Sequence, residues 1–235
     1  MTERTAVITG ATSGIGLACA QRFADDGWNL VLVGRRSAPP RPGAVAIRGD
    51  VGLAETSRRC VDAALARFGR LDAVIGNAGV TLPKTIDETT PEELDRLIAV
   101  NLKGLVFLAQ AAHAPLRESR GSLVAVASNK GLVAQRGSPV YVATKGAAVQ
   151  LARALALDWA AEGIRVNALC PGLVDTPMLT SFAGAEGLAA LAAEQPLGRL
   201  ATPAEVAEVA LFLASPASSF VTGVALPVDG GFTAQ

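Results

Sequence analysis

The sequence predicts an α/β fold, a doubly wound parallel sheet of about seven strands with helices on both faces. Short apolar runs alternate with segments of helical periodicity along the whole chain. The first run leads through a glycine-rich turn directly into a helical pattern, as in the first unit of a nucleotide-binding fold. Because no repeat or low-complexity linker divides the 235 residues, we expect a single domain, residues 1–235.

The expected strands are the short apolar runs at residues 5–9, 30–33, 44–48, 73–75, 122–127, 165–169 and 224–228. The expected helices run from the glycine-rich turn to residue 26, from 53 to 68, from 90 towards 112, from 138 to 162, loosely from 180 to 195, and from 202 to 214. Three prolines within residues 37–43 predict a loop. Asn101 and Gly104 disfavour a regular helix, so they are either a tolerated pair or a local distortion at a site.

The charges balance, with 21 lysines and arginines against 21 aspartates and glutamates. This balance gives no support for nucleic acid or an anionic membrane as a partner. No apolar run reaches the length that predicts a membrane span, and residues 1–4 lead into the first strand without a signal peptide, so we expect a cytoplasmic protein with no membrane partner. Three scattered cysteines and a single histidine, His113, predict no metal site.

The glycine-rich turn reads Thr9-Gly10-Ala11-Thr12-Ser13-Gly14-Ile15-Gly16. Glycines let the backbone approach a pyrophosphate, and the N-terminus of the following helix offers unpaired N–H groups and a positive dipole end. An ordinary tight turn is the alternative. Three glycines between a strand and a helix favour the nucleotide site.

Ser128, Tyr141 and Lys145 form a candidate catalytic group. In a helix over residues 138–162, Tyr141 and Lys145 lie one turn apart on one face, where an ammonium would lower the pKa of the phenol. Such a tyrosine can exchange a proton with an alcohol or a carbonyl. Ser128 ends an apolar strand, so its hydroxyl would project where that strand meets a loop. A buried tyrosine beside a solvated lysine is the alternative, because the Tyr-x-x-x-Lys spacing also recurs by chance.

Over essentially its whole length the chain resembles the short-chain dehydrogenase/reductases of the single-domain type. The markers, weak singly and strong together, are the glycine-rich turn, Asn77-Ala78-Gly79, Asn101, Ser128, Tyr141-x-x-x-Lys145, Pro171-Gly172-x-Val174-x-Thr176 and Val228-Asp229-Gly230-Gly231. The resemblance implies a Rossmann-type fold. It also implies an NAD(P)(H)-dependent oxidoreductase that interconverts a carbonyl and a secondary alcohol by hydride transfer.

The resemblance implies roles for four catalytic residues. Tyr141 would be the general acid in carbonyl reduction and the general base in alcohol oxidation. Ser128 would donate a hydrogen bond to the reacting oxygen. Lys145 would hold the nicotinamide ribose and lower the pKa of the tyrosine, and Asn101 would anchor a water that connects Lys145 to solvent.

The resemblance also implies a set of cofactor-binding residues in the turns after the strands and on the catalytic helix. They are Gly10, Ser13, Gly14, Ile15, Gly16, Asp50, Val51, Asn77, Ala78, Gly79, Tyr141, Lys145, Pro171, Gly172, Val174 and Thr176. The turn glycines would line the pyrophosphate, Asp50 and Val51 the adenine, and Val174 and Thr176 the nicotinamide. The hydroxyl of Ser13 could add a contact to a ribose phosphate.

The end of the second strand favours NADP(H) over NAD(H), with NAD(H) still possible. Gly34 stands where an NAD-preferring enzyme usually carries Asp or Glu, so no carboxylate would repel a 2′-phosphate. Arg35 and Arg36 follow, and a guanidinium can hold a phosphate through two charge-assisted hydrogen bonds. Arg41 and Arg48 are close enough in sequence to strengthen the positive field. The alternative is that Arg35 and Arg36 are solvated loop charges.

Three departures from the family pattern concern the site. Gly76 replaces the first asparagine of the usual Asn-Asn-Ala-Gly, which affects a supporting hydrogen bond. The short link at residues 37–43 stands where the family usually has a helix, so the sequence leaves the wall around the adenosine ribose undefined. Lys130 stands where small residues are common, and it faces either the substrate or solvent.

Residues 178–198 are expected to form a short substrate lid. The lid contains Leu179, Phe182, Leu188 and Leu191 and little charge, which favours an apolar or cyclic small-molecule substrate. A 3-oxoacyl-thioester (acyl-carrier-protein) reductase is the alternative, and a catalytically silent nucleotide-binding regulator is a remote one.

The helices expected at residues 91–112 and 138–162 are apolar around much of their circumference. Such helices need a second surface to bury them. By resemblance that surface belongs to another subunit, and we expect a homotetramer.

Overall fold

The computed structural model describes residues 3–36 and 41–234, which form a parallel sheet of seven strands. The strands are β1 (Thr5–Thr9), β2 (Asn29–Gly34), β3 (Ala44–Arg48), β4 (Ala73–Gly76), β5 (Ser122–Val126), β6 (Arg165–Pro171) and β7 (Ala225–Val228). Their order is β3-β2-β1-β4-β5-β6-β7, which confirms the predicted doubly wound sheet. Because the order reverses between β1 and β4, the turns after these two strands open a crevice.

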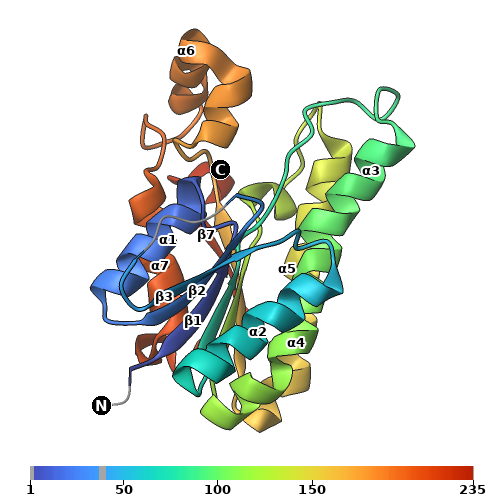
Figure 1. Ribbon diagram of the computed structural model, residues 1–235. Helices are drawn as coiled ribbons and strands as arrows, with labels where there is room; N and C mark the ends of the chain where they lie inside the picture. Colours follow the sequence, from blue (N-terminus) through green and yellow to red (C-terminus); the bar gives the residue numbers. More distant parts are fainter. Residues whose placement is uncertain (1–2, 37–40, 235) are drawn as a thin grey trace.

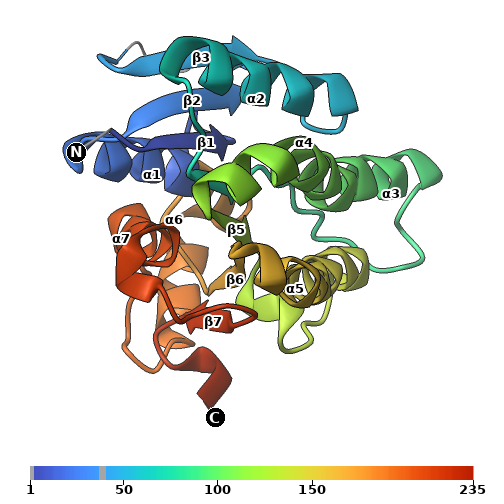
Figure 2. The ribbon, with the colours of Figure 1, turned by 90° about the horizontal axis from the view of Figure 1, so that it is seen from below.

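Helices cover both faces of this sheet (Figures 1 and 2). The helices α1 (Gly14–Asp25) and α7 (Pro203–Ala214) pack on one face, and α2 (Ala54–Phe68), α4 (Gly104–Ser119) and α5 (Pro139–Trp159) pack on the other. Each face has its own apolar core, and adjacent residues of β1 divide between the two: Ile8 packs with Phe23 of α1, and Val7 with Leu108 of α4.

A long helix crosses the second face and contains the expected distortion. It consists of α3 (Pro91–Ile98), a π-helical turn (Ala99–Lys103) and α4. Thr90 caps its start in a capping box with Glu93, as the sequence predicts. The π turn contains Asn101, so of the two alternatives left open for Asn101 and Gly104 the structure has the local distortion.

The same helix corrects one expectation about membranes. Residues Pro91–Ser119 are long and apolar enough to cross a membrane by length and composition, although no stretch of that length was expected. Leu105, Leu108 and Leu116 on its apolar side are buried against the sheet. This helix is therefore accounted for as a core helix of the α/β domain.

The expected lid is the helix α6 (Pro177–Ala193), which projects beyond the carboxyl edge of the sheet (Figure 1). Thr176 caps it, because its hydroxyl accepts a hydrogen bond from the N–H of Leu179 at 3.4 Å. Gly184 has non-helical backbone angles (φ 62°, ψ 177°) and bends the helix into two segments. The loosely helical character predicted for this region is confirmed.

Candidate active site

Five strands deliver predicted site residues to one edge of the sheet. Gly10 follows β1, Gly34 ends β2, Asn77 follows β4, Ser128 follows β5 and Pro171 ends β6. The carboxyl ends of parallel strands meet at the same edge, where open α/β sheets bind their ligands. The fold thus brings residues that are far apart in sequence to one crevice.

The glycine-rich turn presents bare backbone at the start of α1. Gly10 and Gly14 have positive φ angles of 67° and 52°, which favour glycine. A Cβ at Gly16 would collide with the carbonyl oxygen of Gly10, so the turn closes against the helix only with glycine there. Ser13 is the N-cap residue, but its side chain makes no capping bond. This cradle at a helix N-terminus fits the pyrophosphate of a dinucleotide.

Asn77 and Thr9 lock the turns after β4 and β1 together. The side-chain amide of Asn77 donates to the carbonyl of Thr9 at 2.8 Å. The hydroxyl of Thr9 accepts the N–H groups of Asn77 and Ala78, each at 3.0 Å. The sequence analysis included Thr9 in the glycine-rich turn but gave it no role, and its place at the start of that motif was the signal that could have suggested one.

Asn101 ties the loop after β4 to the catalytic helix. Its amide nitrogen donates to the carbonyl of Val80 at 2.9 Å and to the hydroxyl of Thr144 at 3.1 Å, and its oxygen accepts the N–H of Val80 at 2.8 Å. A Cβ at Gly79 would lie 3.4 Å from Nζ of Lys145 and 3.5 Å from Oδ1 of Asn101. Gly79 therefore keeps the space between these two side chains open.

The structure brings Ser128, Tyr141 and Lys145 together. Ser128 is buried, 8% exposed, and its hydroxyl lies near enough to Tyr141, in the first turn of α5, to act on the pKa of the phenol. Its oxygen also accepts the N–H of Lys130 at 3.1 Å. Lys145 lies one turn after Tyr141, with its Nζ 5.9 Å from the centre of the tyrosine ring. Its ammonium donates to the carbonyl of Val126 at 3.0 Å.

The expectation that Lys145 lowers the pKa of Tyr141 is not met in this structure. Burial raises the pKa of Tyr141, and the hydrogen bond from Ser128 opposes that rise only in part. The ammonium of Lys145 donates its hydrogen bond to the carbonyl of Val126 in β5 and not to the phenol of Tyr141. Burial also lowers the pKa of Lys145 to about 8, so this side chain is itself close to losing its charge.

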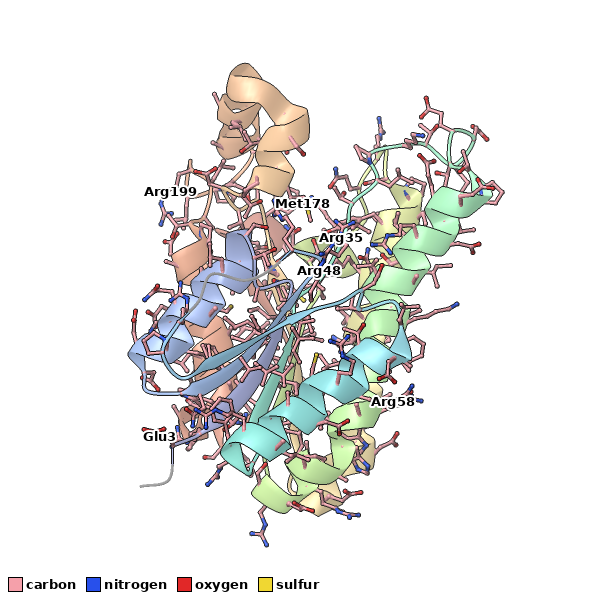
Figure 3. The ribbon with its side chains drawn as sticks, in the orientation of Figure 1. Glu3, Arg35, Arg48, Arg58, Met178 and Arg199 are labelled. Atoms are coloured by element: carbon pink, nitrogen blue, oxygen red, sulfur yellow. The ribbon has the colours of Figure 1, made fainter. Side chains whose placement is uncertain are left out.

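The adenosine end of the crevice is shaped by Gly34 and two arginines. A Cβ at Gly34 would lie 2.6 Å from Cγ2 of Thr12, so a side chain there would displace the glycine-rich turn. Arg48 donates from Nε to the carbonyl of Arg35 at 3.1 Å, which fixes the backbone that carries Arg35 (Figure 3). The side chains of Arg35 and Arg36 are exposed. Residues 37–40 of the short link lie outside the described residues.

Asp50 is held by an ion pair that the sequence did not suggest. Its carboxylate accepts from Arg96 of α3 at 2.7 Å and from the N–H of Gly52 at 2.9 Å. Burial opposes ionisation, but the bonds from Gly52 and Arg96, with the charge of Arg35, hold the pKa of Asp50 below its usual value. Asp50 and Arg35 are thus close in space. Next to them, Val51 packs against the π-helical region at Gly104.

Two departures from the family pattern have structural consequences. A Cβ at Gly76 would lie 2.6 Å from Cδ1 of Leu105, so the leucine occupies the place where an asparagine would stand. Lys130 neither extends into solvent nor forms an ion pair with a described residue. It is half-buried, and its Nζ lies 3.8 Å from the ring centre of Phe232 near the end of the chain.

The segment after β6 closes the crevice from the lid side. Gly172 donates its N–H to the carbonyl of Val228 at 3.0 Å, which joins the ends of β6 and β7. Val174 is buried and bridges to Ala201. The methyl group of Thr176 would lie 3.1 Å from a Cβ at Gly14, so the start of the lid stands beside the glycine-rich turn. Within the described part of the chain, no cluster of His, Cys, Asp and Glu could hold a metal ion.

This fold, with a dinucleotide cradle beside a serine, a tyrosine and a lysine at the carboxyl edge of the sheet, is typical of nucleotide-dependent oxidoreductases. A family model described as Enoyl-(Acyl carrier protein) reductase matches residues 10–233. The cis-4-hydroxycyclohexanecarboxylate dehydrogenase of Sinomonas cyclohexanicum is 40% identical over 99% of this chain and 97% of that protein. The L-fucose dehydrogenase of Oryctolagus cuniculus is 41% identical over 97% and 84%.

A solved structure agrees with these relatives. The 3-ketoacyl-(acyl-carrier-protein) reductase from Brucella melitensis, complexed with NADH, superposes with a TM-score of 0.92 and 35% identity, covering 99% of this chain and 100% of that one. The chain belongs to the short-chain dehydrogenase/reductase family. It is an oxidoreductase that acts on the CH–OH group of a small molecule and interconverts an alcohol and a carbonyl.

Proposed function

We propose that Tyr141 transfers the proton in this reaction and that Ser128 positions the reacting oxygen. The observation that carries the proposal is that the Ser128 hydroxyl lies near enough to the Tyr141 phenol to lower its pKa, at the carboxyl edge of the sheet and one helical turn from Lys145. A substrate oxygen that joins this pair receives a hydrogen bond from Ser128 and exchanges its proton with Tyr141. The nicotinamide cofactor, when bound, supplies or accepts the hydride.

Lys145 and Asn101 assist this proton exchange indirectly. One N–H of the Lys145 ammonium is used on Val126, which leaves two donors for the ribose hydroxyls of the cofactor. The side-chain N–H groups of Asn101 are both used on Val80 and Thr144, so a water that links Lys145 to solvent would donate to an oxygen of Asn101, either the side-chain oxygen or the backbone carbonyl. The π turn at Asn101 supports this role, because it breaks the regular pattern of helical hydrogen bonds.

The cofactor proposed is NADP(H) in preference to NAD(H). Gly34 offers no carboxylate to the ribose, and Thr12 fills the space where one would start. Arg35 is fixed through its carbonyl by Arg48, and its guanidinium acts on Asp50. Arg41 contributes less than its sequence position suggests, because its guanidinium is bound to Gln21 on α1.

The substrate proposed is a small secondary alcohol or ketone, apolar or cyclic in the part that lies under α6. The relatives named for cis-4-hydroxycyclohexanecarboxylate and L-fucose act on ring-shaped molecules by their names, which supports a cyclic substrate. A 3-oxoacyl thioester is the second candidate, because the Brucella melitensis neighbour is named for that activity.

We also propose a cytoplasmic homotetramer. Leu157 on α5 is 82% exposed, and Phe220 after α7 is fully exposed. Large apolar side chains at such exposure are typical of surfaces that bind another subunit.

A substrate panel tests the proposal through the absorbance of the reduced nicotinamide. The panel contains cyclic alcohols, ketones, sugars and 3-oxoacyl thioesters, each measured with NADP(H) and with NAD(H). We expect turnover of a cyclic alcohol or ketone and a higher kcat/KM with NADP(H). Turnover of the thioester alone would favour the second candidate. Turnover that survives in the Tyr141→Phe variant would contradict the role of Tyr141.

A further inference from the structure

The segment after the lid and the end of β7 enclose a cavity that the proposed proton transfer does not use. Its volume is about 100 Å³, which by liquid volume is about three waters. Leu173, Gln195, Asp229 and the paired Arg199 and Glu205 are among its lining residues. It therefore combines an apolar wall with several polar groups.

Gln195 brings an unsatisfied donor to this cavity. Its side chain is 4% exposed, and its Nε2 has no hydrogen-bond partner among the described residues. A buried donor left unpaired destabilises the folded state, and most such groups in proteins have a partner. The amide of Gln195 thus requires a partner that enters the cavity.

Asp229 brings an acceptor to the same cavity. It is 7% exposed, and its two carboxylate oxygens accept the N–H groups of Gly231 at 3.2 Å and Thr233 at 3.0 Å. A carboxylate oxygen can accept a second hydrogen bond. A hydroxyl group between the two side chains could accept from Gln195 and donate to Asp229.

The charges around the cavity favour a neutral group over an anion. Arg199 and Glu205 neutralise each other in an ion pair of 2.7 Å. Of the nearby groups, Lys130 is positive, while Glu194 and Asp229 are negative and both act on Lys130 electrostatically. The sum is one excess negative charge, which repels a carboxylate and tolerates a hydroxyl.

The cavity adjoins the catalytic centre. A Cβ at Gly172 would lie 2.7 Å from Cβ of Asp229 and 3.3 Å from Oε1 of Gln195, so both side chains stand against the turn after β6. Asp229 also acts electrostatically on Cys170 near the end of β6, and that end lies beside Ser128, because Ala127 donates its N–H to the carbonyl of Leu169 at 2.8 Å. A substrate whose reacting oxygen lies at Ser128 can therefore extend its far end towards Gln195.

We propose that Gln195 is a specificity-determining residue that hydrogen-bonds a second, neutral hydroxyl group of the substrate. The substrate class is then a diol or another polyhydroxylated alcohol, recognised by the Gln195 donor together with the Asp229 acceptor. This inference rests on the proposed site of proton transfer, and it makes the far end of the substrate polar where the lid alone suggested an apolar one.

The test compares cyclohexane-1,2-diol with cyclohexanol in the oxidation assay, for the wild type and for Gln195→Met, which keeps the length of the side chain and removes the amide. We expect the wild type to prefer the diol in kcat/KM by about 10-fold or more, and the variant to lose that preference. Gln110→Met, an exposed change on α4, is the matched control and should keep the wild-type ratio. Because an unpaired buried amide is removed, Gln195→Met should melt at the same or a higher temperature.

A third substrate, 4-hydroxycyclohexanecarboxylate, tests the charge argument. A wild-type preference for this anion over the diol would overturn the inference, and so would an unchanged diol preference in Gln195→Met, which would leave only structural waters in the cavity. Turnover of cyclohexanol without any diol preference would overturn it and leave the proposed proton transfer intact. If no alcohol is turned over, the proposed function fails. The role of Gln195 is then decided by melting temperatures: we compare the rise that the diol gives, in the presence of NADP⁺, in the wild type and in Gln195→Met.

Discussion

Replacing Lys145 with methionine should remove a rise in stability that the cofactor-free protein gains above pH 7. Lys145 is 6% exposed, and burial lowers its pKa from 10.5 to about 8. In the unfolded chain the side chain keeps its proton up to its ordinary pKa. Between the two values the unfolded state binds more protons than the folded state, so the free energy of unfolding increases with pH.

The magnitude follows from the two pKa values. The full difference between 10.5 and about 8 corresponds to about 3 kcal/mol. Integrated from pH 7 to 9.5, the gain is about 2 kcal/mol, because the folded-state proton is lost mostly within this window. The buried thiols act in the opposite direction above about pH 9: burial raises the pKa of Cys19 and Cys60 to about 12, so ionisation favours the unfolded chain. Both proteins contain these thiols, so their effect cancels in the difference. The third thiol, Cys170, interacts with Lys145, but burial raises its pKa to about 11, so in the folded protein it stays protonated up to pH 9.5 and the difference up to that pH reports on Lys145.

Urea unfolding followed by the fluorescence of Trp28 and Trp159, without cofactor and at one protein concentration, measures this difference at several pH values. The wild type should gain about 2 kcal/mol relative to Lys145→Met between pH 7 and 9.5. The exposed Lys103→Met, on the long helix, is the matched control and should follow the wild type. Parallel curves for the wild type and Lys145→Met would show that the folded protein keeps this lysine fully charged.

Three further predictions concern activity and assembly. Tyr141→Phe should bind cofactor normally in a fluorescence titration, while turnover falls by about 100-fold or more; near-normal turnover would exclude the phenol from proton transfer. Arg35→Ala should lower kcat/KM with NADP(H) by about 10-fold or more and change it little with NAD(H), and an equal loss with both cofactors would show that Arg35 does not bind the 2′-phosphate. Light scattering at micromolar concentration should give the mass of a tetramer. The mass of a monomer would contradict the proposed assembly.

The fold could be predicted from the sequence because each strand is a short apolar run between polar turns. The capping boxes at Thr90 and Thr202 marked two helix starts correctly. Helix ends were less predictable. We expected the third helix to end near residue 112, before Pro115. Instead, α4 continues to Ser119 with Pro115 buried. Packing against the sheet outweighs the local cost of a proline, which no local pattern reveals.

The residues of the candidate site were likewise predictable only in part. Motif residues such as Ser128 and Tyr141 could be placed because they follow from spacing and resemblance. Thr9, Arg96 and Gln195 could not, since each matters only through a contact with a distant segment. The direction of the Tyr141 pKa was missed for a related reason: spacing on a helix brings Lys145 within one turn, but the burial of the phenol and the position of the Val126 carbonyl are tertiary facts.

The contacts of Asn101 show why the distortion of its helix belongs to the site. The regular pattern would bond each N–H to the carbonyl four residues back, whereas here the N–H of Gly104 reaches the carbonyl of Ala99, five residues back. The wider turn seats the Asn101 side chain between Val80 and Thr144 with its three hydrogen bonds. Both N–H donors of this amide are used, so the only free position left on the side chain is the second lone pair of its oxygen. The side chain therefore positions the loop at Val80 against the helix that carries Lys145, and a water at this place would have to donate its hydrogen bond either to the Asn101 side-chain oxygen or to a carbonyl of the π turn.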